Sequence, residues 1–411
     1  MFARNIETKV LEACADTPVV LLNGARQAGK TTLVQRLAQE KLGASYVSLD
    51  DLTTLALARS DPVGFIKQQA TPVVIDEVQR APEIFLPIKV AVDSHRVPGS
   101  FILTGSANVL MLPKLADSLA GRIEILTMWP LSQGEIEGTK EDFISRVFAE
   151  KIRPPRPAPL ERKELLERIL RGGYPAIWDR QTADSRRRWY ESYRTTLLER
   201  DVRDLSMIRS VSEFPKLLHV LAARTSMLLN LADLSRNSGI QQDTLKRYYS
   251  LLQALFLVVE LPAWFANLGK RLLKTPKIAL ADTGLWADIL GIELERLQNE
   301  PVLLGQCLEN FVVMELRKQS AWSERSVRLH HYRDLKNHEV DIVLEDRAGD
   351  IVGVEVKSAA TVAPSDFNGL RKLKELTGAR FKHGIVLYTG ATAAPFAEGL
   401  WALPIQSLWR S

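Results

Sequence analysis

The stretch "PVVLLNGARQAGKTTL", residues 18–33, decides the fold of the N-terminal part of the chain. Residues 18–23 form a short, continuous apolar run, which is typical of a strand buried on both faces in a parallel sheet. The glycine-rich residues 24–31 follow at once, and the apolar spacing of residues 32–42 predicts a helix that stops at Gly43. Strand, loop and helix in this order favour an α/β fold.

Other apolar runs extend this pattern along the chain. They cover residues 46–50, 72–77 and 100–106, and the stretches between them are long enough for helices. Alternation of buried strands and helices predicts a parallel sheet flanked by helices.

Residues 24–31 match the pattern G-x-x-x-x-G-K-[ST] in the required context of a strand before and a helix after. Glycines let such a loop aim its backbone N–H groups inward at phosphates, and the helix adds its positive N-terminal end. Lysine then reaches the β and γ phosphates, and the hydroxyl that follows holds Mg²⁺. We therefore predict an ATP and Mg²⁺ site whose cofactor-binding residues are Gly24, Ala25, Arg26, Gln27, Ala28, Gly29, Lys30, Thr31, Thr32 and Asp76.

Asp76 and Glu77 end the apolar strand "PVVIDE". Ligands of parallel sheets bind at this carboxyl-terminal edge, so we expect Asp76 to hold Mg²⁺ together with Thr31, and Glu77 to act as general base toward water. The pair could instead begin a helix, as N-cap and first-turn acid.

Three further residues are candidates for sensing or stabilising the γ-phosphate. Ser106 and Asn108 follow the strand-like run "SFILTGS", where they could hydrogen-bond to the γ-phosphate or simply form a turn. Arg122, in "SLAGRIEIL", could stabilise phosphoryl charge within its own subunit or across two subunits, or form a surface ion pair.

Composition sets the limits on the class of protein. The chain has 411 residues, 46% of them hydrophobic, a net charge of +5 and two cysteines. It can bury a large core, and its basic balance is compatible with nucleic acid. Two cysteines cannot build a disulfide framework, no apolar run is long enough to cross a bilayer, and the N-terminus has no export signal. We expect a cytoplasmic protein with no membrane partner.

We divide the chain into four parts: residues 1–145 with the phosphate loop, a helical arm at 146–205 behind a proline-rich connector, residues 206–290, and a second α/β domain at 291–411. Residues 228–262 read as helix, turn at Gly239, second helix and β-rich tail, which fits a winged helix-turn-helix. Lys246 and Arg247 would lie early on its second helix, where they could meet DNA. A protein-contact module is the alternative.

The last part contains "HEVDIVLEDRAGDIVGVEVKS", residues 338–358, two alternating runs joined by a turn. Glu355 and Lys357 share one face of the second run, and Asp341 lies on the first. Two carboxylates would bind Mg²⁺ or Mn²⁺, which activates a nucleophile, and Lys357 would steady phosphate charge. The alternative is a solvent-facing hairpin whose ion pairs contribute at most about 1 kcal/mol.

The quoted stretches, with "IDEVQRAPEIF", "WPLSQGE", "GGYPAIW", "TPKIALADTGL" and "GQCLENFVVMEL", resemble proteins that join a AAA-type ATPase domain to a DUF4143 C-terminal region. The resemblance spans nearly the whole chain, with departures at Ala25 and Ala28. It implies a AAA+ ATPase, a winged-helix region and a tail similar to the PD-(D/E)xK restriction-endonuclease fold. It also implies that Glu309 completes a metal site with Asp341 and Glu355.

Two functions are compatible with these features. The first is a Mg²⁺-dependent ATPase of the AAA+ class that acts on nucleic acid, DNA in preference to RNA, and carries a metal-dependent nuclease. The second is an ATP-dependent switch or scaffold whose tail only binds nucleic acid or a protein. Either could be a homo-oligomer.

Overall fold

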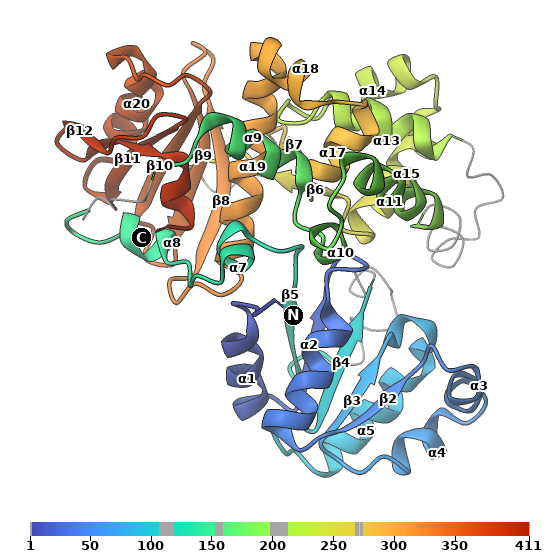
Figure 1. Ribbon diagram of the computed structural model, residues 1–411. Helices are drawn as coiled ribbons and strands as arrows, with labels where there is room; N and C mark the ends of the chain where they lie inside the picture. Colours follow the sequence, from blue (N-terminus) through green and yellow to red (C-terminus); the bar gives the residue numbers. More distant parts are fainter. Residues whose placement is uncertain are drawn as a thin grey trace. The chain divides into compact units, whose positions relative to one another are not determined.

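The computed structural model describes residues 2–106, 119–152, 159–197, 213–267, 271 and 274–410 (Figure 1). The chain forms two compact units: residues 1–131 with 252–257, and residues 132–251 with 258–411. Each unit has its own parallel or mixed sheet. None of the described helices combines the length and the apolar character that crossing a bilayer requires.

The first unit is an α/β layer structure. Its elements are α1 (Glu7–Asp16), β1 (Val19–Asn23), α2 (Lys30–Leu37), β2 (Ser45–Ser48), α3 (Leu52–Ser60), α4 (Pro62–Lys67), β3 (Val73–Asp76), α5 (Phe85–Ser94), β4 (Phe101–Gly105) and β5 (Ile123–Thr127). All five strands run parallel, in the order β2-β3-β4-β1-β5. The predicted α/β fold with a parallel sheet and its first four strands are confirmed, and β5 is an additional strand.

The order of the strands in the first unit determines where the candidate nucleotide site lies. β4 lies between β1, which leads into the phosphate loop, and β3, which ends at Asp76. β1, β3 and β4 are buried along their whole length, as their apolar runs require. The carboxyl ends of these three strands therefore meet at one edge, where a ligand of a parallel sheet binds.

The second unit begins with helices. They are α7 (Gln133–Glu137), α8 (Phe143–Val147), α9 (Arg162–Arg171), α10 (Pro175–Trp178), α11 (Ala183–Thr196), α13 (Phe214–Ala223), α14 (Leu231–Ser238) and α15 (Gln242–Ala254), whose last residues belong to the first unit. Gly239, at φ 72°, ends α14 and turns the chain toward α15. β6 (Val258–Leu261) and β7 (Lys277–Leu280) then pair antiparallel, and Leu228 adds a bridge to Lys277.

The rest of this unit is a six-stranded sheet with helices. α17 (Thr283–Leu290), α18 (Leu294–Asn299) and the long α19 (Pro301–Ser320) precede β8 (Val327–Arg333), β9 (Glu339–Asp346), β10 (Ile351–Lys357), α20 (Asn368–Thr377), β11 (Phe381–Tyr388), β12 (Ala394–Ala397) and β13 (Leu400–Pro404). The order is β12-β13-β11-β10-β9-β8. β8, β9 and β10 pair antiparallel, whereas β10, β11 and β13 pair parallel.

Buried polar contacts join the segments that the sequence analysis separates at residue 205. Asp282 accepts a hydrogen bond from the Gly173 N–H at 2.6 Å and one from the Tyr190 hydroxyl at 3.0 Å. Arg194 forms an ion pair with the nearly buried carboxylate of Asp288 at 2.7 Å. Because such groups need partners when they leave water, the helical arm and the later segments pack as a single unit.

Candidate nucleotide site and carboxylate cluster

The phosphate loop connects β1 to α2. Gly24 has a φ of 142°, and a Cβ at this position would lie 2.0 Å from the backbone oxygen of Met128. Only glycine fits both conditions. The Nζ atom of Lys30 is buried and donates to the backbone oxygens of Gly24 at 2.8 Å and Ala25 at 2.9 Å. The loop thus folds around its own lysine, at the start of a helix whose N-terminal end favours anions.

Asp76 lies at the end of β3 beside the start of α2. Its Oδ2 accepts hydrogen bonds from the Thr31 hydroxyl at 2.9 Å and the Tyr46 hydroxyl at 2.8 Å, and its Oδ1 accepts one from Thr104. Hard oxygen atoms of a hydroxyl and a carboxylate are the ligands that Mg²⁺ prefers. The Thr31 and Asp76 pair therefore fits a magnesium ion, as the sequence predicts.

Tyr46, on β2, was not singled out by sequence reasoning. Burial, together with the hydrogen bond to Asp76, raises the pKa of its hydroxyl to about 12. The hydroxyl therefore stays a donor at physiological pH and fixes the carboxylate of Asp76. A tyrosine in the short run "YVSLD" gives no local sign of this role.

Glu77 follows Asp76 in a left-handed conformation, with φ 61°. Its Oε2 accepts a hydrogen bond from the Ser106 hydroxyl at 2.9 Å, and its backbone N–H donates to Thr104 at 3.1 Å. Gln79 bridges the pair, donating to Glu77 and, at 2.8 Å, to Ser106. A non-glycine residue in this region is strained, and such strain is typical of functional sites. The predicted base and the predicted serine thus lie in contact.

The remaining predicted residues of this site have different placements. Ala25 and Ala28 are buried, Arg26 and Gly29 are half-buried, and Gln27 and Thr32 are exposed. Asn108 lies outside the described residues.

Arg122 lies away from the phosphate loop of its own chain. It precedes β5, whose first residue pairs with Val19 at the start of β1, whereas the phosphate loop follows the end of β1. Its guanidinium binds Asp93 at 2.5 and 3.0 Å. The exposed ion pair replaces the expectation of a role within the same subunit, because the parallel register holds Arg122 at the opposite edge of the sheet.

In the second unit, the strands and α19 bring together the four residues predicted for the nuclease-like site. Asp341 on β9 accepts the Val356 N–H of β10 at 2.9 Å, and Glu355 follows the paired residues of these strands. Lys357 donates to Glu355 at 2.8 Å. Glu309, on α19, reaches the same cluster through a shared partner.

That partner is Lys277, which the sequence reasoning missed. Its Nζ lies 2.7 Å from Glu309, 2.7 Å from Glu339 and 3.4 Å from Asp341, with 5% of the side chain exposed. Lys277 opens β7, an otherwise apolar strand that is buried throughout. The only local sign was a lysine at the head of the apolar run "KIALA". We call Lys277, Glu309, Glu339, Asp341, Glu355 and Lys357 the carboxylate cluster.

Burial and charge compete in this cluster. Burial disfavours the charge on Lys277, but Glu309, Asp341 and Glu339 outweigh it and raise the pKa of the ammonium above its usual value. Burial, followed by repulsion from Asp341, raises the pKa of Glu309 and that of Glu355 to about 8. Lys277 therefore stays positive while the surrounding acids compete for protons.

In the structure, the predicted metal ligands contact groups of the protein itself. Both oxygens of Asp341 are engaged, Oδ1 by Lys277 and Oδ2 by the Val356 N–H. Within the described part of the chain, no group of three or more His, Cys, Asp or Glu side chains has the arrangement of a metal site. The expected Mg²⁺ or Mn²⁺ site of Glu309, Asp341 and Glu355 stays a prediction, and a lysine from a distant segment contacts two of its three residues, Glu309 and Asp341.

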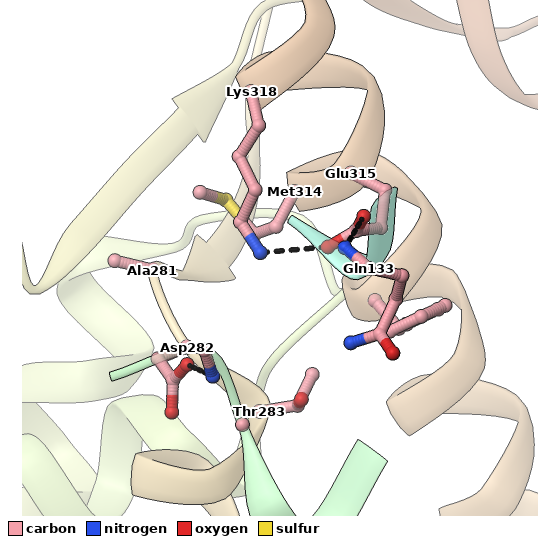
Figure 2. A pocket seen from close by; sticks show the side chains of 10 residues that line it. Gln133, Ala281, Asp282, Thr283, Met314, Glu315 and Lys318 are labelled. Carbon is pink, nitrogen blue, oxygen red and sulfur yellow. Dashed lines mark hydrogen bonds and ion pairs between the residues drawn. The ribbon is translucent and has the colours of Figure 1, made fainter. Parts of the chain in front are cut away.

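A small cavity in the second unit lies apart from this cluster, between α7, α19 and the loops before α10 and α17 (Figure 2). Lys318 binds Glu315 at 2.7 Å, and Glu315 accepts the Gln133 N–H at 2.9 Å. With a volume of about 10 Å³, the cavity has room for about one water molecule. It is too small for a nucleotide, and the hydrogen bond from the Gln133 N–H to Glu315 links α7 to α19.

Three parts of the chain match known protein families. Residues 16–137 match the family described as AAA domain, and residues 304–408 match the domain of unknown function DUF4143. Residues 162–296 match a further domain of unknown function, DUF8612. The chain therefore contains a AAA domain followed by a DUF4143 region, as the resemblance predicts.

Particular relatives span almost the whole chain. Two uncharacterized proteins, one from Mycobacterium bovis and one from Mycobacterium tuberculosis, are each 29% identical over 406 residues, which is 98% of this chain and 84% of theirs. A Walker-type ATPase of Pyrococcus abyssi is 18% identical with a TM-score of 0.46, covering 71% of this chain and 96% of that structure. At that score the similarity adds nothing to the fold described above.

Proposed function

We propose that this AAA-type ATPase uses Mg²⁺ and ATP hydrolysis to switch the nucleic-acid binding of its second unit. The observation that carries the proposal is the convergence of Thr31, Asp76 and Glu77 at one sheet edge, next to Lys30. Lys30 and the loop would hold the phosphates, and Thr31 and Asp76 would hold the ion. Mg²⁺ would neutralise the developing phosphate charge.

Glu77 is the candidate general base, and Ser106 sets its position. The hydrogen bond that the Ser106 hydroxyl donates to Glu77 at 2.9 Å lowers the basicity of this carboxylate toward water. Ser106 lies at the end of β4, between the phosphate loop and Asp76 in the sheet. Contact between Ser106 and a γ-phosphate would release Glu77. Nucleotide state and base activation would then be linked by one hydrogen bond.

A winged-helix interaction with DNA is supported by the order of elements in the second unit. α13, α14 and α15 are followed by the β6 and β7 hairpin, with Leu228 bridged to β7. α15 exposes Lys246 and Arg247, and the ion pair of Lys246 with Asp243 is long, at 4.0 Å. Both cations are thus accessible to phosphates, for which we propose DNA in preference to RNA.

The C-terminal sheet and its carboxylate cluster favour nucleic-acid binding over nucleic-acid cleavage. Its antiparallel β8, β9 and β10, followed by α20 and a parallel β11, agree with the nuclease-like order that the resemblance implies. Cleavage would need a metal-activated nucleophile, and the cluster holds Lys277 where the ion would be. We therefore favour the switch with a binding tail over the metal-dependent nuclease.

The test measures ATP turnover and DNA binding on the same preparations. Wild type should release phosphate from Mg²⁺-ATP, and Glu77→Gln should bind ATP while its turnover falls about 100-fold, the usual range for a lost general base. Affinity for a DNA duplex should differ between ATP held by Glu77→Gln and ADP. Equal affinity in both states would contradict the switch.

The DNA contact is tested by removing two charges. Lys246→Ala with Arg247→Ala should lower DNA affinity about tenfold and reduce the salt dependence by about two charges. Arg187→Ala with Arg188→Ala, on the exposed face of α11, removes the same charge and is the matched control. If both double variants bind alike, the charge is used non-specifically and the winged helix is not the contact.

A homo-oligomer remains part of the proposal because Arg122, half-buried in its ion pair with Asp93, could reach a neighbouring subunit. Arg122→Ala should lower ATP turnover only under conditions in which light scattering shows an assembly. A monomer with and without ATP would contradict it.

A further inference from the structure

Lys277 belongs to a different part of the second unit from the other residues of the carboxylate cluster. It belongs to β7, which pairs with β6 and bridges Leu228, whereas the acids lie on α19 and the C-terminal sheet. Its contacts with Glu309 and Asp341 span 32 and 64 residues of sequence. Tertiary packing therefore places the ammonium of Lys277 beside these acids.

Every element around Lys277 presents a titratable group to it. α19 contributes Glu309, β9 contributes Glu339 and Asp341, and Glu355 on β10 and His331 on β8 interact at longer range. Lys277 has three N–H donors, and three carboxylates lie within 3.4 Å of its nitrogen. Lys277 therefore has as many N–H donors as there are carboxylates close to its nitrogen.

We propose that the ammonium of Lys277 takes the place of a divalent cation among Glu309, Glu339 and Asp341, so that the cluster is a metal-free site which gains a divalent-cation site when this charge is removed. The proposal uses neither ATP hydrolysis nor DNA binding, so its test stands apart from theirs.

The chemistry of the substitution explains why such a site binds and does not cut. An ammonium balances carboxylate charge by hydrogen bonding, but it has no empty orbital with which to coordinate water and lower its pKa. The cluster therefore has no source of hydroxide.

The oxygens needed for a metal are present once Lys277 is neutral. Removing its charge would release Oε1 of Glu309 and Oδ1 of Asp341. Oε2 of Glu355 is buried and has no hydrogen-bond partner among the described residues. Three carboxylates with unengaged oxygens would then repel one another, and a hard divalent ion relieves that repulsion.

The experiment titrates Mn²⁺ into the nucleotide-free full chain and follows free Mn²⁺ by electron paramagnetic resonance. All variants carry Asp76→Asn, which removes the metal ligand of the phosphate loop. Lys277→Met, which keeps the length of the side chain, should bind one Mn²⁺ at least tenfold more tightly than its parent, and Mn²⁺ should raise its thermal midpoint. Adding Asp341→Asn should abolish both gains, and Lys277→Arg, which keeps the charge, should titrate like the parent.

The Mn²⁺ titrations either support or overturn the proposal. A folded Lys277→Met that gains no Mn²⁺ site overturns the proposal. If Lys277→Met does not purify as a folded protein, the parent is compared with its Asp341→Asn derivative. Equal titrations support the metal-free site, and a Mn²⁺ site that the parent has and Asp341→Asn lacks overturns it.

Discussion

Two buried lysines of this chain, Lys30 in the phosphate loop and Lys277 in the carboxylate cluster, have different partners. The hydrogen bonds of Lys30 include two to backbone oxygens, which are neutral dipoles, whereas Lys277 lies among three carboxylates. An incoming phosphate could replace these carbonyls as partners of Lys30. A lysine held by acids has its charge already balanced. The same residue type therefore serves ligand binding in one unit and internal neutralisation in the other.

The largest effect that tests this contrast is on stability. Lys277→Met leaves Glu309 and Asp341 without the ammonium that they share, which should destabilise the second unit by about 3–5 kcal/mol. ATP turnover by the first unit should change far less. Denaturant unfolding followed by the fluorescence of Trp264 and its neighbours measures the loss, and Lys163→Met, an exposed lysine, is the control. An unchanged midpoint would show that the three acids do not depend on Lys277.

Lys30→Met should give the reverse result. Turnover of ATP should fall about 100-fold or more, because a preorganised charge at the phosphates is lost. Stability should change little, because carbonyl oxygens without the lysine can be solvated or rearranged. Phosphate release and thermal melting are measured on the same sample, with the exposed Lys41→Met as control. A large stability loss together with normal turnover would remove the distinction between the two lysines.

A buried acid outside both sites, Glu141, sharpens the comparison, because the hydrogen bonds that it accepts include two from neutral donors. Burial, followed by repulsion from Glu315, raises the pKa of Glu141 to about 8, while Ser132 and the Gly134 N–H donate to it. The folded chain therefore keeps a proton that the unfolded chain, at the usual 4.5, has lost. Stability should fall as pH rises between these values, by about 1.4 kcal/mol per pH unit.

Glu141→Gln should remove that slope. It should match wild type near pH 5 and exceed it near pH 8, as measured by thermal midpoints across this range. Glu150→Gln, an exposed acid on the same segment, should leave the slope unchanged. Parallel midpoint curves for wild type and Glu141→Gln would mean that Glu141 is ionised in the folded chain.

The smallest effect concerns the fixing of Asp76. Tyr46→Phe removes the 2.8 Å hydrogen bond to Oδ2 while Thr31 still donates to that atom. The loss of about 1 kcal/mol should lower turnover at limiting Mg²⁺ about fivefold and be rescued by higher Mg²⁺. Full turnover at low Mg²⁺ would show that Thr31 and Thr104 hold Asp76 without help.

Local patterns predicted much of the first unit and part of the second. The apolar runs of β1, β3 and β4 are continuous and bounded, so their burial could be read directly. β5 has no such pattern, since all five of its residues are only half-buried. Because β5 could not be recognised in the sequence, the edge of the sheet at which Arg122 lies could not be predicted.

The sequence by itself determined the phosphate loop, the acids at the end of β3 and the alternation that places Asp341 and Glu355 on neighbouring strands. These depend on residues close together in the chain, where sterics and side-chain periodicity act directly. Only the tertiary structure decided that Tyr46 fixes Asp76 and that Lys277 fills the carboxylate cluster. The charge of a lysine acts over a few ångströms in space, and the partners it finds there lie 32 and 64 residues away in the chain.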